Sequence, residues 1–130
     1  MLPKEHNQRY QKFSQMLNQL QQLMAQENPE PEKISAMRKE VQQFFETQIM
    51  SLDNLELDRS IAFQVKSYLT EIHKELRLLY VDLTFLQASR NPQTTQTRLA
   101  TIKDRLKTLI GYCGNILSKT KLTQDEEYIR

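Results

Sequence analysis

Apolar side chains recur along this sequence at alternating intervals of three and four residues, the spacing of an α-helix that buries one face. Four segments show the pattern: residues 10–24, 34–49, 62–86 and 99–116. The apolar positions are Tyr10, Phe13, Leu17, Leu20 and Met24; Ile34, Met37, Val41, Phe44 or Phe45, and Ile49; Ala62, Val65, Leu69, Ile72, Leu76, Leu79, Leu83 and Leu86; and Leu99, Ile102, Leu106, Leu109, Cys113 and Ile116. Because no segment shows the two-residue alternation of a strand, the sequence predicts an all-α fold.

Short polar segments separate the four predicted helices. Asn28-Pro29 and Asn91-Pro92 each precede a helix, where asparagine is expected to act as the cap and proline is tolerated in the first turn. The middle connection, residues 51–58, has capping residues but no proline. Because short loops favour antiparallel neighbours, we predict four long antiparallel helices in an up-down-up-down bundle, with the third helix the longest. The alternative is two long hairpins that complete their cores in a homodimer.

The length and composition fit one small domain. The 130 residues include only two glycines and four prolines, a composition that favours long helices. We assign residues 1–121 to a single helical bundle domain and residues 122–130, which contain three acidic residues, to an acidic C-terminal tail. The polar first residues, the single cysteine and the lack of a long apolar run predict a cytoplasmic protein without membrane insertion.

Few side chains are candidates for chemistry. Cys113 lies on the fourth apolar stripe, where a small thiol packs well but lacks the exposure and the neighbouring base that a nucleophile needs. His6 and His73 are far apart and lie in no metal-binding spacing, so we expect both to be solvated surface residues. The sequence therefore predicts no catalytic residue, no metal site and no cofactor, and we expect a protein that is not an enzyme.

His73 supports one alternative function. Histidine phosphotransfer domains are four-helix bundles of this size with an exposed histidine on a central helix. Lys66, Lys74 and Arg77 lie close enough to His73 in the sequence to hold a phosphoryl group. Those domains usually have a small residue one turn after the histidine, where this chain has Arg77. A phosphotransfer-like signalling function for His73 is therefore the alternative to a protein-binding function.

Basic residues are concentrated on the predicted fourth helix. Residues 91–121 contain six lysines and arginines against one acidic residue, Asp104. Lys103 and Lys107 lie one turn apart within this segment. A solvated face, an acidic protein partner and the chain's own acidic tail are all compatible with this pattern. Nucleic acid is a disfavoured partner, because aromatic residues do not interleave the basic ones and the net charge is only +2.

Two glycines, Gly111 and Gly114, interrupt the same predicted helix. Each costs about 1 kcal/mol relative to alanine inside a helix, which suggests a structural reason for their presence. One interpretation is a shallow notch where another helix or a partner's side chain approaches the backbone. The other is a kink or fraying near the end of the helix.

The predicted third helix has a second apolar stripe outside its main one. Leu78, Val81, Phe85 and Ala88 follow one another at intervals of three and four residues. A helix that is apolar on nearly opposite sides must be covered on both. Three coverings remain open: the chain's own tail through Leu122, Tyr128 and Ile129, a second copy in a homodimer, or a protein partner.

Over essentially its whole length, the sequence resembles the PatD family of cyanobacterial heterocyst frequency control proteins. Segments such as residues 9–13 (RYQKF) and 76–83 (LRLLYVDL) carry the resemblance. It implies a small non-enzymatic regulator of cell differentiation that binds the division protein FtsZ. FtsZ-type proteins are acidic, so a basic helix would complement such a partner in a salt-sensitive association. Chosen from the apolar stripe and the basic helix alone, the predicted partner-binding residues are Leu78, Val81, Phe85, Lys103 and Lys107.

Overall fold

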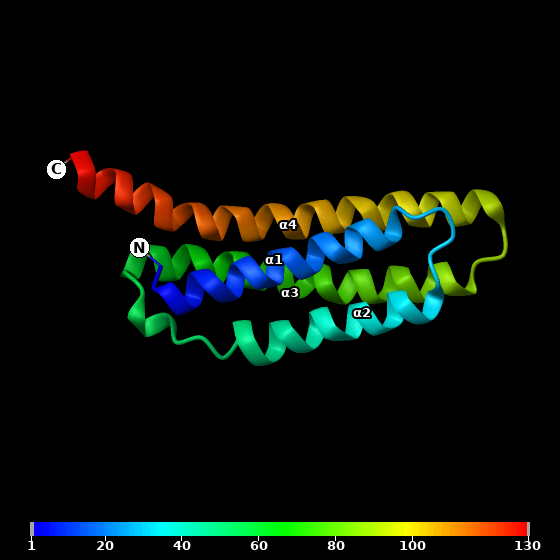
Figure 1. Cartoon of the computed structure of the whole chain (residues 1–130), viewed down its shortest axis with the longest axis horizontal. Helices are drawn as coiled ribbons and strands as arrows, with labels where there is room; N and C mark the ends of the chain where they lie inside the picture. The colour runs from blue at the N-terminus through cyan, green and yellow to red at the C-terminus, as the bar shows by residue number, and fades with distance from the viewer. Residues whose placement is uncertain (1, 130) are drawn as a thin grey trace.

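Four long helices, side by side along one axis, form the protein (Figure 1). The structure is a computed structural model that describes residues 2–129, with the side chains of residues 2–119. The helices are α1 (Lys4–Met24), α2 (Pro31–Phe44), α3 (Arg59–Ala88) and α4 (Pro92–Ile129). Successive helices run in opposite directions, and the described residues contain no strand. The predicted all-α, up-down-up-down bundle is confirmed.

The third helix is long, as predicted. With 30 residues, α3 spans about 45 Å at the usual rise of an α-helix. Among the residues whose side chains are described, α3 is the longest helix; α4 runs on to Ile129. The predicted acidic tail, residues 122–130, lies outside the described side chains.

The helices do not contact one another equally. α4 packs closely along both α1 and α3, whereas α2 packs mainly on α1 and touches α3 at few positions. The buried core runs the length of the bundle and draws on every helix; its fully buried large side chains are Tyr10, Phe13, Leu17, Leu20, Met24, Phe45, Ile49, Ile72, Leu79, Ile102, Leu106 and Leu109. All of these positions lie on the four predicted apolar stripes. The side of α3 that faces α2 is the most open side of the bundle.

The end of α2 explains why either Phe44 or Phe45 fitted the second predicted apolar stripe. After Phe44 the helix widens into a π-helix, η1 (Phe45–Ile49), and Met50 N–H donates to the Phe45 carbonyl five residues earlier, at 2.9 Å. Phe45 is fully buried, and Phe44 is partly buried with its ring stacked on Phe13 at 6.2 Å between centroids. Both phenylalanines therefore pack against α1.

The predicted caps differ in outcome. The Asn91 side chain accepts a hydrogen bond from Gln93 N–H at 2.9 Å, and Pro92 opens α4, which confirms the prediction there. The prediction for Asn28 is wrong, because α2 begins three residues later at Pro31 and its cap position is Glu30. Between α2 and α3, a short 3₁₀ turn, η2 (Asn54–Glu56), is capped by the Asp53 carboxylate, which accepts from Leu55 N–H.

The two glycines of α4 are not a notch for another helix. A Cβ atom built on Gly111 or on Gly114 would meet no heavy atom within 4 Å, and α4 continues as one helix past both. The interpretations as a notch filled by another helix of the bundle and as an early helix end are therefore wrong, whereas the approach of a partner's side chain and a kink stay predictions. The glycines cost helix stability without making room for anything among the described residues.

Gly111→Ala and Gly114→Ala are each expected to raise the free energy of unfolding by about 0.5–1 kcal/mol. Alanine lowers the backbone entropy of the unfolded chain and meets open space in the folded one. Urea denaturation followed by circular dichroism measures the change. A loss of stability in either variant would contradict the open surroundings described for that glycine.

Candidate partner-binding surface

The second apolar stripe of α3 lies on the outside of the bundle. We call Leu78, Val81 and Phe85 the α3 outer surface. Val81 is 39% exposed and Phe85 is 52% exposed, while Leu78 is partly buried. Leu79 and Leu83, on the opposite side of the helix, fill the core. The four-helix core therefore uses one side of this part of α3 and leaves the other to solvent.

Arg98 of α4 supports one edge of the α3 outer surface. Its guanidinium carbon lies 4.9 Å from the centroid of the Phe85 ring, a cation–π contact that also limits the ring's freedom. The predicted covering by Leu122, Tyr128 and Ile129 concerns side chains outside the described residues. Covering by a second copy or by a protein partner stays a prediction.

Lys103 and Lys107 do not join the α3 outer surface. Both side chains are exposed on α4. Arg105, two positions from each of them, points toward α3, because it contacts carboxylates on that helix. Two residues correspond to about 200° around a helix, so Lys103 and Lys107 lie on the far side of α4 from α3. The five predicted partner-binding residues therefore form two separate surfaces.

A cluster of charged side chains joins α3 to α4 beside the α3 outer surface. Arg105 donates to Asp82 through Nε and to Glu75 through Nη1, the latter at 3.0 Å. Arg98 Nη1 lies 3.8 Å from the second Asp82 oxygen. Burial by itself would lower the pKa of the Arg105 guanidinium, but its hydrogen bonds to Asp82 and Glu75 raise that pKa above its ordinary value. Arg105 is therefore paired with two carboxylates of α3, while Arg98 makes only the longer contact with Asp82 and keeps a partly exposed side chain.

This cluster was missed in the sequence, although a signal for it is present. Glu75 and Asp82 are separated by seven residues on α3, and Arg98 and Arg105 are separated by seven residues on α4. A seven-residue spacing keeps two side chains on the same side of a helix over two turns. Matched acidic and basic pairs at that spacing are therefore expected to meet where neighbouring helices lie antiparallel.

The two histidines have different surroundings. His73 is exposed, as predicted, and its ring lies 6.2 Å from that of Phe45. The prediction of a solvated His6 is wrong: it is buried, with Nε2 3.7 Å from a Glu56 oxygen. Because α1 begins at Lys4, His6 lies one turn before Tyr10 on the same buried stripe. Phosphotransfer at His73 stays a prediction.

Cys113 is a buried free thiol in the core. Burial raises the pKa of this thiol to about 12, so it stays protonated at neutral pH, whereas a catalytic cysteine needs a lowered pKa. Among the residues that the structure describes, no three His, Cys, Asp or Glu side chains converge as a metal site. No helix in that part of the chain combines the length and the apolar character that crossing a membrane requires.

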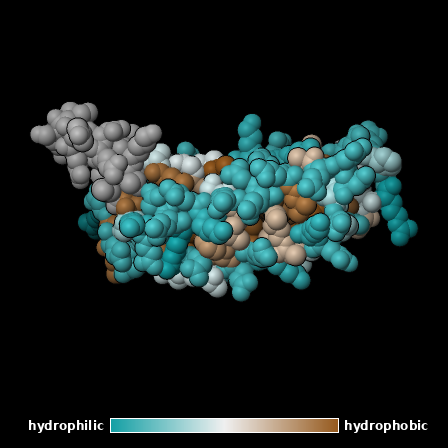
Figure 2. Space-filling view, viewed as in Figure 1, coloured by the Kyte–Doolittle hydropathy of each residue, from teal (hydrophilic) through white to brown (hydrophobic). Residues whose placement is uncertain are grey.

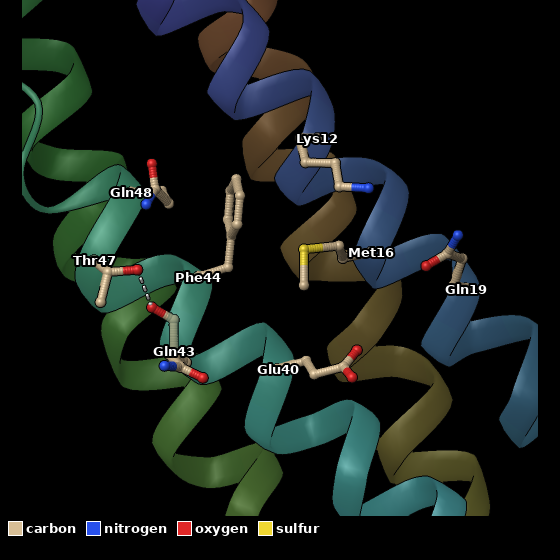
Figure 3. Close-up of a pocket in the computed structure, with 8 residues that line it drawn as sticks. All are labelled: Lys12, Met16, Gln19, Glu40, Gln43, Phe44, Thr47 and Gln48. Atoms are coloured by element: carbon tan, nitrogen blue, oxygen red, sulfur yellow. Dashed lines mark hydrogen bonds between the residues drawn. The ribbon is translucent and has the colours of Figure 1, made fainter.

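A shallow concavity of about 440 Å³ lies on the surface between α1 and the segment formed by α2 and η1 (Figure 3). Phe44 extends from α2 into this space, and Met16 faces it from α1. Polar and charged side chains form the rim, among them Lys12 and Glu40. Figure 2 shows that hydrophilic residues dominate this face of the bundle and that apolar areas between them are small. The Thr47 hydroxyl in this lining donates to the Gln43 carbonyl at 2.8 Å, and we assign the concavity no chemistry.

The family model described as CRR41 C-terminal domain matches residues 9–112, from the first half of α1 to beyond the middle of α4. No curated protein and no solved structure matches the chain. The family match includes the α3 outer surface and the charged cluster between α3 and α4. Because it covers most of the sequence, the chain belongs to the CRR41 C-terminal domain family.

Proposed function

We propose that this protein is a non-enzymatic binding module whose protein partner docks on the α3 outer surface. The observation that carries the proposal is the exposure of Val81 and Phe85, next to Leu78, on a helix whose other side already fills the core. Apolar side chains gathered at one exposed site commonly mark a protein interface, and aromatic residues contribute most to such interfaces.

The surroundings of this surface suggest the chemistry of the partner. Arg98 lies against Phe85 and 3.8 Å from Asp82. Lys74 is exposed one turn before Leu78 and lies 3.6 Å from the half-buried Glu71. A partner that offers apolar side chains flanked by carboxylates would complement this arrangement. Because the basic residues lie at the rim, the association rate should fall as the salt concentration rises.

The resemblance to the PatD family makes FtsZ the first partner to test, with a role in setting how many cells differentiate as heterocysts. In this proposal the protein acts in the cytoplasm, where its one cysteine remains a reduced thiol. Lys103 and Lys107 would then contact a different part of the partner from the α3 outer surface. A homodimer through α3 is the competing use of the same side chains.

Phe85→Glu is expected to weaken binding to FtsZ by about 2 kcal/mol or more, because a carboxylate would replace a large apolar contact. The matched control is Phe63→Glu on the same helix: Phe63 is 74% exposed and about 33 Å from Phe85 along the axis. Biolayer interferometry with immobilised FtsZ measures affinity, and circular dichroism verifies folding. Analytical ultracentrifugation shows whether the surface instead joins two copies.

The same binding assay tests the other assigned residues. Leu78→Glu and the paired Lys103→Glu, Lys107→Glu variant address the two separate surfaces. If folded protein binds FtsZ equally well with each of these changes and with Phe85→Glu, the assigned residues are wrong. If no variant or wild-type protein binds FtsZ, a pull-down that compares wild-type protein with Phe85→Glu tests the surface without assuming the partner.

A further inference from the structure

A groove follows the open side of the bundle between α2 and α3. Two concavities of about 280 and 320 Å³ lie along it and share the side chains of Arg38 and Tyr80. At one end, Gln87 Nε2 donates to Ser35 Oγ at 3.0 Å across the two helices. At the other end, the rings of His73 and Phe45 are 6.2 Å apart. The Gln87–Ser35 hydrogen bond therefore bridges α2 and α3 at one end of the groove, and the His73 ring lines its other end.

The larger of these concavities is lined by nitrogen donors from both helices. Arg38 and Gln42 come from α2, and His73 and Arg77 come from α3. Within the part of the chain described with side chains, no carboxylate lies within ion-pair distance of Arg38 or Arg77, in contrast to Arg105. Two arginines on facing helices, left without carboxylates, leave a local excess of positive charge in a concave site.

One carboxylate also lines this concavity. Glu46 accepts a hydrogen bond from Gln42 Nε2 at 2.8 Å, so part of its acceptor capacity is already used. Its charge offsets one of the two arginine charges and opposes any bound anion. The net charge of the lining is therefore positive but small. Removal of the Glu46 charge should strengthen the binding of an anion.

Two ring contacts hold the donors in position before any ligand arrives. The Arg38 guanidinium carbon lies 4.4 Å from the centroid of the Tyr80 ring. Such a contact occupies the face of a guanidinium and leaves its N–H groups, which lie in the plane, free to donate. The contact of His73 with Phe45 similarly restricts the imidazole. Pre-positioned donors lose less conformational entropy on binding.

We infer that Arg38, His73 and Arg77 form a phosphate-binding site, which we call the α2–α3 anion site. A phosphate group has several oxygens that accept hydrogen bonds from donors in different directions, as two helices would provide here, whereas a carboxylate suits a single planar fork. The volume of about 320 Å³ suits a phosphate and a small body attached to it. The binding is non-covalent and is independent of the proposed function of the α3 outer surface.

Two sources could supply the phosphate group: a small phosphate ester, or a phosphorylated side chain of another protein. Both would be held by the same donors. α2 and α3 make few contacts with each other, and a bound phosphate would bridge them. Its binding should therefore also raise the melting temperature of the protein. The site lies beside the α3 outer surface but does not include Leu78, Val81 or Phe85.

Titration of the full chain with inorganic phosphate, followed by NMR of the arginine Nε–Hε signals, tests the site. The Arg38→Gln, Arg77→Gln double variant is expected to bind about tenfold more weakly. Arg59→Gln with Arg90→Gln is the matched control, since both of these arginines are exposed and lie outside the groove. Glu46→Gln should bind about threefold more tightly, because it removes the opposing charge.

Several outcomes would overturn the inference. They are the absence of saturable binding, an equal loss of affinity in the two arginine double variants, or binding of acetate as tight as that of phosphate. A phosphoserine peptide that binds more tightly than inorganic phosphate would assign the site to a phosphorylated protein. Equal binding of the two would assign it to a small phosphate ester. Phe85→Glu should leave phosphate binding unchanged, so failure here and failure of the proposed function are distinguishable.

Discussion

Phe13→Ala is expected to lower the free energy of unfolding by about 3–5 kcal/mol. Phe13 is fully buried, with its ring 6.2 Å from Phe44 and 5.6 Å from Phe45. Its removal would leave a cavity between α1 and the end of α2 that other side chains could not fill without moving a helix. Because α2 packs mainly on α1, the lost Phe13 contacts weaken the attachment of the helix that has the fewest contacts in the bundle.

Urea denaturation of wild-type and Phe13→Ala protein, monitored by circular dichroism at 222 nm, measures this change. Phe63→Ala is the matched control, because Phe63 is mostly exposed, and its effect should stay within about 0.5 kcal/mol. Native-state hydrogen exchange adds a second readout: amides of α2 should lose more protection than amides of α3 in Phe13→Ala. A loss below about 1 kcal/mol would contradict the role given to Phe13.

The core could be predicted from the sequence because helical periodicity alone determines which side of each helix is buried. The choice between Phe44 and Phe45 could not, since it depends on a π-helix that begins where the two residues meet. His6 was misplaced because the predicted apolar stripe begins only at Tyr10, whereas α1 begins at Lys4 and carries His6 onto the same buried side. Local boundaries, not periodicity, limited the prediction.

The candidate site was less predictable, because it depends on how neighbouring helices are rotated. The position of Leu78, Val81 and Phe85 on the outside of α3 follows from their spacing, and the structure agrees. Lys103 and Lys107 were grouped with them because of the charge of a whole helix, without regard to direction around it. The contacts of Arg105 with Asp82 and Glu75 show which side of α4 faces α3. Lys103 and Lys107 lie on the other side of α4.

The placement of α2 links the fold to both proposed sites. α4 takes the central position against α1 and α3, so α2 completes the core mainly through α1. This arrangement leaves α3 exposed along two sides: the α3 outer surface, and the groove that contains the α2–α3 anion site. Arg77, which lines the groove, precedes Val81 by one turn, so a ligand in the groove would lie close to a docked partner.

Asp82→Ala is expected to lower the free energy of unfolding by about 2–4 kcal/mol, because it leaves Arg105 without its main partner. The Asp82 side chain is only 8% exposed, and that of Arg105 is 23% exposed. Breaking a fully buried ion pair costs about 3–5 kcal/mol, and the partial exposure of Arg105 and its remaining bond to Glu75 reduce the loss.

A double-mutant cycle separates the ion pair from the packing around it. Asp82→Leu combined with Arg105→Met replaces both charges by apolar side chains, and we expect this double variant to be more stable than Asp82→Ala. Urea denaturation at low and high salt measures all members of the cycle, and the coupling should change little with salt, because the pair is largely shielded from solvent. Additive effects of the two single changes would mean that Asp82 and Arg105 do not hold α3 to α4.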